Sequence, residues 1–253
     1  MIIKTIQWNI GGGKIRKEND PVEGPYREDG MNYIEVVLKK YNPDIITLQE
    51  THTDEKIIQA NILAQKLHLP HMVNDVYDTS HIEQGQGLGQ AIISRFPLRD
   101  HQFHFFINPN LTMLQENGET WTTHDKGVSS CFIQIEYKLL KVATLHLVPF
   151  RKFNVDPTDI TFTELRRNIT DLLLPKQDQF LLQGDFNFDN DSLEALLPDI
   201  LHQNVSEILQ KEPTTPKGRK YDHILFRGIK LIHSEVISNV LTDHFPVYSE
   251  FEI

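Results

Sequence analysis

Residues 178–187, DQFLLQGDFN, join a short apolar run to small and polar residues. The apolar part, residues 178–182, is typical of a buried β-strand, and Asp185 and Asn187 follow where that strand ends. In layered α/β proteins, a rigid scaffold presents functional side chains at the ends of its strands. The stretch therefore predicts a core strand that carries two candidate site residues.

Polar residues interrupt or end apolar runs at five further places. They are Gln7-Trp8-Asn9, Leu48-Gln49-Glu50, Thr144-Leu145-His146, Tyr221-Asp222-His223 and Thr242-Asp243-His244. Burying several carboxylates without partners costs several kcal/mol for each, so a cation or imidazolium groups must accompany them. Oxygen ligands without thiolates favour Mg²⁺, Mn²⁺ or Ca²⁺ over zinc, and magnesium often completes its shell with substrate phosphate. The set therefore predicts phosphoryl chemistry.

The composition is that of an ordinary globular protein. The 253 residues include 25 basic and 35 acidic side chains, for a net charge of −10 that opposes non-specific binding to duplex DNA. No apolar stretch is long enough to span a membrane, and the first residues, MIIKTIQWNI, do not resemble a signal peptide. We expect one domain over residues 1–253, a cytoplasmic location, a buried structural thiol at Cys131 and no obligate protein partner.

Strand-like runs recur along the whole chain, and three helical patterns interrupt them. The strand runs are 2–8, 44–48, 90–96, 101–107, 128–137, 141–148, 178–182, 221–226, 229–237 and 245–251. The helical patterns lie at 34–41, 57–67 and 162–173, and Thr161 with Glu164 has the spacing of a capping box. The short connections 96–101 and 226–229 suggest antiparallel pairs, and the strand–helix–strand units allow parallel ones. These elements predict an α/β sandwich with mixed sheets, over which residues 108–126 form a surface loop suited to substrate specificity.

The six motifs together resemble the endonuclease/exonuclease/phosphatase (deoxyribonuclease I-like) superfamily. They stand in that family's order from residue 8 to residue 247, with Gly184-Asp185-Phe186-Asn187 and Thr242-Asp243-His244-Phe245-Pro246-Val247 as the longest. The resemblance implies a four-layer α/β sandwich, with two mixed β-sheets flanked by helices. It also implies a phosphodiesterase or phosphatase that uses Mg²⁺, with Mn²⁺ as a possible substitute.

The resemblance also carries roles to individual residues. The residues implied for the metal are Asn9, Glu50 and Asp243, and those implied for catalysis are His146, Asp185, Asn187, Asp222 and His244. Asp185 and Asn187 orient water and phosphate, and we favour Asp185 over the His244–Asp222 pair as the group that activates the water. His146 stabilises the phosphoryl oxygens or protonates the leaving oxygen. The deoxyribonuclease I branch pairs this histidine with a carboxylate, which the sequence does not identify, since position 90 is Gln.

Other interpretations stay open. Each motif taken alone is more often a turn, a cap or a satisfied core histidine than part of a site. The favoured function is a nuclease or related phosphodiesterase acting on nucleic acid or a small phosphorylated molecule. The alternatives are a phosphatase, a sphingomyelin-type phosphodiesterase and an inactive binding module. A basic cleft rim favours nucleic acid, whereas a narrow pocket closed by residues 108–126 favours a small molecule. The loop residues His124, Lys126, Arg151 and Lys152 are candidate phosphate contacts, for which we expect solvated positions.

Overall fold

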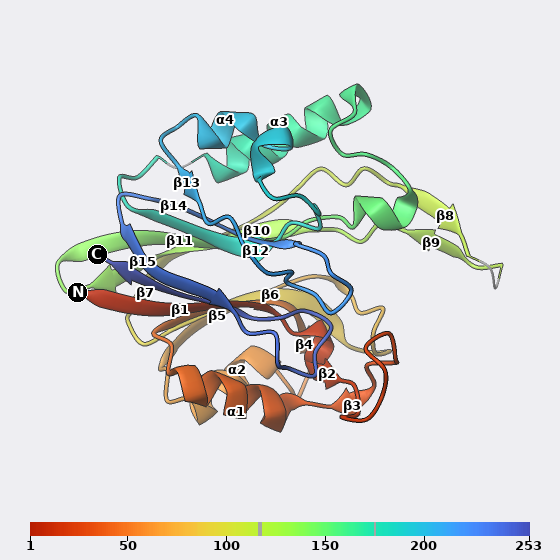
Figure 1. The fold of residues 1–253 in the computed structure, drawn as a ribbon, viewed down its shortest axis with the longest axis horizontal. Coiled ribbons are helices and arrows are strands. Elements are labelled where there is room, and N and C mark those ends of the chain that lie inside the picture. Colours follow the sequence, from red (N-terminus) through yellow and green to blue (C-terminus); the bar gives the residue numbers. More distant parts are fainter. Residues whose placement is uncertain (116–117, 175) are drawn as a thin grey trace.

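Two six-stranded sheets stack face to face, and helices cover both outer faces (Figure 1). The computed structural model describes residues 1–115, 118–174 and 176–253. Helices α1 (Met31–Tyr41) and α2 (Gln59–Lys66) cover one sheet, and α3 (Thr163–Leu173) and α4 (Pro198–Leu201) cover the other. The predicted four-layer α/β sandwich is confirmed, whereas the extent of the domain stays a prediction.

The first sheet has the strand order β15-β16-β1-β4-β6-β5. Its strands are β1 (Ile2–Asn9), β4 (Ile45–Thr53), β5 (His71–Thr79), β6 (Gly87–Ser94), β15 (Lys230–Val236) and β16 (Val247–Glu252). Strand β1 pairs in parallel with β4, and the crossover between them contains α1. Since β1 also pairs antiparallel with β16, the sheet is mixed, as the sequence predicts.

The second sheet has the order β13-β14-β12-β11-β10-β7. Its strands are β7 (Leu98–Phe105), β10 (Gly127–Ile135), β11 (Lys138–His146), β12 (Phe180–Asp185), β13 (Ser206–Glu207) and β14 (Asp222–Arg227). Strands β11 and β12 are parallel, and α3 lies in the crossover between them. Two two-stranded ladders complete the strands: β2 (Lys14–Ile15) with β3 (Glu28–Asp29), and β8 (Thr112–Leu114) with β9 (Thr120–Thr122).

The two short connections do not join antiparallel neighbours, so that prediction is wrong. Strand β6 belongs to the first sheet and β7 to the second, and the chain passes between the sheets from β14 to β15 in the same way. Stacked sheets lie about 10 Å apart, a distance that a few residues can span. A short connection therefore does not establish that the strands it joins are paired.

The facing surfaces of the two sheets change from apolar to polar along the strands. In β1, inward-facing positions run from Ile3 through Thr5 and Gln7 to Asn9, all of them buried. The same gradient brings Gln49, Gln90 and Gln183 into the layer between the sheets, where each is fully buried. Gln183 donates to the Thr5 hydroxyl across this layer, with an Nε2–Oγ1 distance of 3.0 Å. The polar ends of the strands on both sheets therefore meet at one edge of the sandwich.

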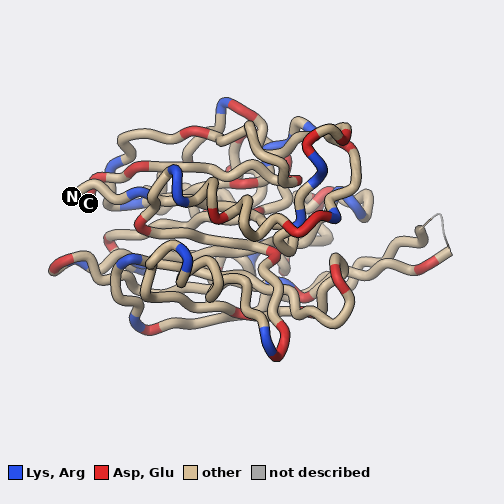
Figure 2. The backbone as a smooth tube through the Cα atoms, turned by 90° about the horizontal axis from the view of Figure 1, so that it is seen from below, with Lys and Arg blue, Asp and Glu red and all other residues tan. Residues whose placement is uncertain are grey.

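Three local predictions need correction. The segment 108–126 contains the β8–β9 hairpin, which projects from the body of the molecule in both views (Figures 1 and 2). The strand β5 is absent from the sequence prediction. Thr161 and Glu164 do not form a capping box, because the carboxylate of Asp159 accepts the Thr161 backbone N–H and caps a preceding 3-10 turn instead.

Two other predictions agree with the structure. Cys131 is fully buried, and this burial raises the pKa of its thiol to about 12, as suits a structural rather than a reactive cysteine. Among the described residues, no helix has the length and apolar character needed to cross a membrane.

Candidate active site

The site forms where strands from both sheets end together. In the second sheet, the parallel register of β11 and β12 sets His146 beside Asp185, and the antiparallel register with β14 sets Asp222 opposite Asp185. From the first sheet, Asn9 at the end of β1 reaches across, and its Nδ2 donates to Asp185 Oδ2 at 2.9 Å. The strand register therefore gathers residues that are far apart in the sequence.

Asp185 lies at the centre of this arrangement. Its Oδ2 is 3.5 Å from Nε2 of His146 and 3.6 Å from Nε2 of His244. The side chain is only 1% exposed, and this burial raises the pKa of Asp185 to about 6. A carboxyl group with a pKa near neutrality can accept and release a proton at physiological pH.

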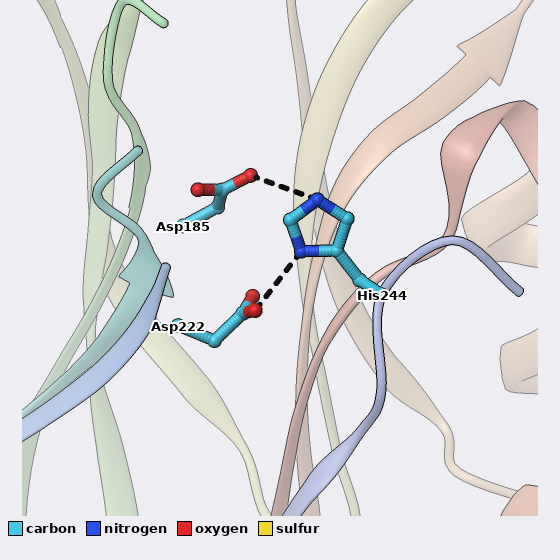
Figure 3. A group of neighbouring side chains, drawn as sticks. All are labelled: Asp185, Asp222 and His244. Atoms are coloured by element: carbon cyan, nitrogen blue, oxygen red, sulfur yellow. Dashed lines mark hydrogen bonds and ion pairs between the residues drawn. The ribbon is translucent and has the colours of Figure 1, made fainter. Parts of the chain in front are cut away.

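His244 is held by two aspartates (Figure 3). Its Nδ1 lies 2.9 Å from Asp222 Oδ2, which is the predicted contact, and its Nε2 points towards Asp185. Burial by itself lowers the pKa of His244, but the carboxylates of Asp222 and Asp185 outweigh it and hold the pKa well above the ordinary value. His244 is therefore protonated at neutral pH, as an anion-binding group should be.

Glu50 stands on a β-bulge in β4. The register with β6 shifts between Gln49 and Thr51, and Glu50 has a φ of +53°, in the left-handed region. A bulge re-aims the side chain, which here turns a residue of β4 towards the site, with Oε1 3.8 Å from His146 Nε2. Burial opposes ionisation of Glu50, but nearby positive charge, chiefly that of Lys126, keeps its pKa below the ordinary value. Glu50 is therefore an anion at neutral pH.

Asp243 and Asn9 complete the predicted metal set beside Glu50. Among the residues that the structure describes, the buried Oδ1 atom of Asp243 has no hydrogen-bond partner, and burial raises the pKa of this carboxyl group. The Oδ1 atom of Asn9 accepts the Gly11 backbone N–H, at 3.1 Å. A Cβ atom at position 11 would lie 2.9 Å from Asp243 Oδ1, so a glycine here leaves space beside the Asp243 carboxylate. An unpaired carboxylate oxygen beside a second carboxylate fits a divalent cation with oxygen ligands.

A second group of ligand-type atoms comprises Asp185, Asp222 and His244, whose atoms all lie within 4.8 Å of one another. His244 already forms ion pairs with both aspartates, and Asp222 occupies the Nδ1 position of His244. A cation there would have to displace that hydrogen bond. Glu50 and Asp243 are therefore the better candidates for metal ligands.

In the described ranges of the chain, His146 Nδ1 has no carboxylate partner. That nitrogen lies 3.0 Å from the Tyr77 hydroxyl oxygen and 3.0 Å from Lys126 Nζ. Gln90 donates instead to the Gly127 and Thr144 carbonyl oxygens and to the Ser129 hydroxyl, so it supports the sheet. Burial, together with the charge of Lys126, lowers the pKa of His146 well below the ordinary value, and the imidazole is neutral at pH 7.

These side chains line a cavity of about 530 Å³. The β8–β9 hairpin contributes Trp121 to its wall, and the segment after β11 contributes Lys152 and Phe153. Trp121 stacks on Phe153 with ring centroids 6.0 Å apart, and Lys152 Nζ lies 4.9 Å from the Trp121 ring. The segment 108–126 thus forms part of the cavity wall, although not as an irregular loop.

The rim of the cavity is basic, although the chain as a whole is acidic. Figure 2 shows residues of both signs of charge distributed along the chain. The rim includes Arg151, Lys217 and Arg219, of which Arg219 pairs with Asp189 at 2.7 Å and Arg151 with the same carboxylate at 3.8 Å. Positive charge around an acidic floor suits a substrate with an anionic group.

Asn187 lines the cavity beside Asp185, but part of its side chain is engaged. It has a φ of +49°, its backbone N–H donates to Asp185 Oδ1, and its Nδ2 donates to the Leu147 carbonyl oxygen at 2.9 Å. Seven of the eight predicted site residues line the cavity. The eighth, Asp222, contacts Nδ1 of His244 through its Oδ2. Their chemical roles stay predictions.

The family model for the endonuclease/exonuclease/phosphatase family matches residues 6–244, nearly the whole chain. The chain belongs to the endonuclease/exonuclease/phosphatase family. Members of this family hydrolyse phosphodiesters or phosphate esters. No curated protein matches the chain in sequence.

Solved structures show how widely this family varies around the fold. An endonuclease/exonuclease/phosphatase from Beutenbergia cavernae is 16% identical, with a TM-score of 0.74 over 100% of this chain and 72% of that one. D. rerio TDP2, complexed with a single-strand DNA product, is 14% identical, with a TM-score of 0.66 over 100% and 99%. A mannosyl-6-phosphatase from Bacteroides thetaiotaomicron is 16% identical, with a TM-score of 0.61 over 99% and 100%. At these identities the likeness establishes the shared fold and not a shared substrate.

Lys126 is a candidate phosphate contact in the sequence analysis, but its expected solvated position is wrong, because it is 4% exposed and lines the cavity. Tyr77, which contacts His146, was not predicted and belongs to the strand that was not predicted. Lys126 immediately precedes the apolar run at 127–135, so its position at a strand end was a usable signal. The alternation in residues 71–79 was a weaker signal for Tyr77.

Proposed function

We propose that this protein is a divalent-metal-dependent phosphodiesterase, in which an activated water attacks phosphorus in line with the leaving oxygen. The observation that carries the proposal is the position of Asp185 Oδ2, within 3.6 Å of both His146 Nε2 and His244 Nε2 on the cavity floor. A proton acceptor between two imidazoles suits a reaction in which a water loses a proton while negative charge grows on phosphoryl oxygens.

Each residue has a role that follows from its protonation state. Asp185, with a pKa raised to about 6, takes the proton of the attacking water. His244 is protonated, and its Nε2 donates to a phosphoryl oxygen, while Asp222 fixes its tautomer and orientation. Asn9 orients Asp185, and Asn187 supports the same carboxylate through its backbone N–H.

Glu50 and Asp243, with the side-chain oxygen Oδ1 of Asn9, would hold Mg²⁺ or Mn²⁺. The unpaired buried oxygen of Asp243 and the ionised state of Glu50 support this assignment. The cation supplies Lewis-acid stabilisation of the phosphoryl oxygens when it is bound. Two carboxylates that line one cavity are otherwise expensive to bury without a cation.

The cavity favours a phosphorylated molecule of limited size or the end of a single strand over intact duplex. A volume of about 530 Å³, with Trp121 in its wall, accommodates a few sugar or base units, and the basic rim attracts additional anionic groups. A phosphatase acting on monoesters is the second candidate, since the same floor would bind a terminal phosphate. The cytoplasmic location stays a prediction.

The test is the hydrolysis of bis-p-nitrophenyl phosphate beside p-nitrophenyl phosphate, with Mg²⁺, with Mn²⁺ and with EDTA. Metal-dependent cleavage of the diester supports the phosphodiesterase, and cleavage of the monoester alone supports the phosphatase. Cleavage of neither ester with either cation contradicts both candidate functions. Cleavage that continues in EDTA, or in His244→Ala at an unchanged rate, contradicts the proposed mechanism.

A further inference from the structure

Lys126 occupies a place in the site that the roles assigned so far do not use. It comes directly before β10, its side chain is 4% exposed, and it lines the cavity. Its Nζ lies 3.0 Å from Nδ1 and 3.5 Å from Nε2 of His146, and 4.8 Å from the centre of the Tyr77 ring. The amine thus stands at the edge of the reaction centre, inside the cavity.

The ammonium group lacks a direct counterion. Within the described part of the chain, Lys126 Nζ forms no ion pair with a carboxylate, and its hydrogen-bond contacts are with the His146 ring. The charges that act on it from a greater distance are the anions Glu50, Asp185 and Asp78 and the cation Lys152. Burying a cation without a direct partner is costly. A lysine buried in this way inside a cavity is therefore a candidate for a functional role.

Burial also makes Lys126 a ready proton donor, because it lowers the pKa of the amine to about 8. His146 lies between Lys126 and Asp185, with its Nε2 3.5 Å from Asp185 Oδ2. Its Nδ1 faces two donor groups, the Tyr77 hydroxyl and the Lys126 amine, and therefore acts as an acceptor, which holds the lysine in place. A ring nitrogen that accepts from Lys126 carries no proton to give to the leaving oxygen.

The order of the groups matters for an in-line reaction. His244, Asp185, His146 and Lys126 follow one another as neighbours, with successive contacts of 3.6, 3.5 and 3.0 Å. In-line displacement places the attacking and leaving oxygens on opposite sides of phosphorus. With Asp185 beside the attacking water, Lys126, which contacts the far side of His146 and lines the same cavity, is a donor suited to the leaving oxygen.

We propose that Lys126 is a catalytic residue that donates a proton to the leaving oxygen, while His146 positions it. This inference rests on the proposed function. The water oxygen bonds to phosphorus as the water gives one proton to Asp185. The bond from phosphorus to the leaving oxygen breaks with its electron pair on that oxygen, which takes a proton from Lys126 Nζ. Proton exchange with solvent then recharges the amine and ionises Asp185, so no further reactant is needed.

The experiment compares two diesters that differ only in the leaving group, methyl 4-nitrophenyl phosphate and methyl phenyl phosphate. Nitrophenolate leaves readily without a proton. Phenolate is more basic and depends more strongly on receiving a proton as it leaves. A general acid contributes about 10²–10⁴-fold. Lys126→Met should therefore lower kcat for the phenyl ester by about 100-fold or more, and for the nitrophenyl ester by less than about tenfold.

Lys126→Arg separates proton donation from charge. A guanidinium keeps the positive charge but does not release a proton at neutral pH. This variant should bind inorganic phosphate in calorimetry nearly as wild type does, while keeping the selective loss on the phenyl ester. Lys126→Met should bind inorganic phosphate about tenfold more weakly, as expected for the loss of one charged hydrogen bond.

The matched control is Lys141→Met. Lys141 lies within β11, five residues before His146, where its Nζ lies 4.9 Å from the Phe132 ring, and its loss should leave both esters unaffected. Equal losses on both esters in Lys126→Met, or no loss, would overturn the inference while leaving the proposed function intact. Failure of the wild-type protein to cleave either ester with Mg²⁺ or Mn²⁺ would reject the diesterase function and the inference together.

Discussion

The Nδ2 atom of Asn9 donates a 2.9 Å hydrogen bond to Oδ2 of Asp185, which ties the end of β1 in one sheet to the end of β12 in the other. The same oxygen faces the Nε2 atoms of His146 and His244. The central carboxylate of the site is therefore positioned by both sheets, and its geometry depends on how they stack.

Replacing Asp185 by Asn should abolish hydrolysis while keeping the fold. The amide has nearly the same shape but cannot take a proton from water, so kcat should fall by about 10²–10⁴-fold. Because burial disfavours the ionised carboxyl group, the variant should be at least as stable as wild type in EDTA at neutral pH. Steady-state kinetics and urea unfolding check the two parts, and an active Asp185→Asn enzyme would remove Asp185 as the base.

Replacing Glu50 by Gln should weaken the binding of Mg²⁺. The substitution removes one of the two carboxylates that would hold the cation, so affinity should fall by about tenfold or more. Calorimetric titration with MgCl₂ measures this directly, without an activity assay. Glu235→Gln, on the exposed face of β15, is the control and should bind the cation as wild type does. Unchanged binding in Glu50→Gln would exclude Glu50 as a ligand.

Replacing Asp222 by Asn should lower the pKa of His244. Burial lowers this pKa and Asp222 is the strongest opposing influence, so its removal leaves burial less opposed. A histidine that is protonated at neutral pH in wild type should therefore lose its proton at lower pH in the variant. Nuclear magnetic resonance titration of the His244 ring follows the change, and kcat should fall with it. An unaltered titration would mean that Asp222 does not govern the charge of His244.

Replacing Lys126 by Met should stabilise the metal-free protein at neutral pH. The pKa of Lys126 is about 8 when folded against about 10.4 when unfolded, so the folded state binds the proton less tightly. Wild-type stability should rise as pH increases through this window, and the advantage of the variant, up to about 3 kcal/mol near pH 7, should shrink. Urea unfolding in EDTA at several pH values tests this. An advantage that grows with pH would have the wrong sign.

Replacing Trp121 by Ala should weaken substrate binding more than catalysis. Trp121 forms part of the cavity wall and stacks on Phe153. KM should rise about three- to tenfold with a smaller change in kcat, as expected for the loss of one aromatic contact. Tyr137→Ala, at a side chain that is 89% exposed, is the control. A fall in kcat alone would place Trp121 in the chemistry instead.

The sequence predicts much of the fold because the spacing of apolar residues indicates which side chains of each strand or helix are buried. Alternation along residues 2–9 identifies an inward face that ends in Asn9, and the run before Asp185 does the same in the second sheet. Helices α1 and α3 follow from their apolar spacing. The pairing of the strands does not follow, because β6 and β7 are adjacent in the chain and lie in different sheets.

The sequence by itself determined which strand ends carry polar side chains and to which family the chain is similar, since both depend on residue type and order. Only the tertiary structure decided what faces those side chains. His146 meets Tyr77 and Lys126 where a carboxylate was sought, and Lys126 is buried where a solvated lysine was expected. The physical reason is that a strand's pattern fixes its own buried face, whereas contacts and charge states are set by residues from distant strands brought close by folding.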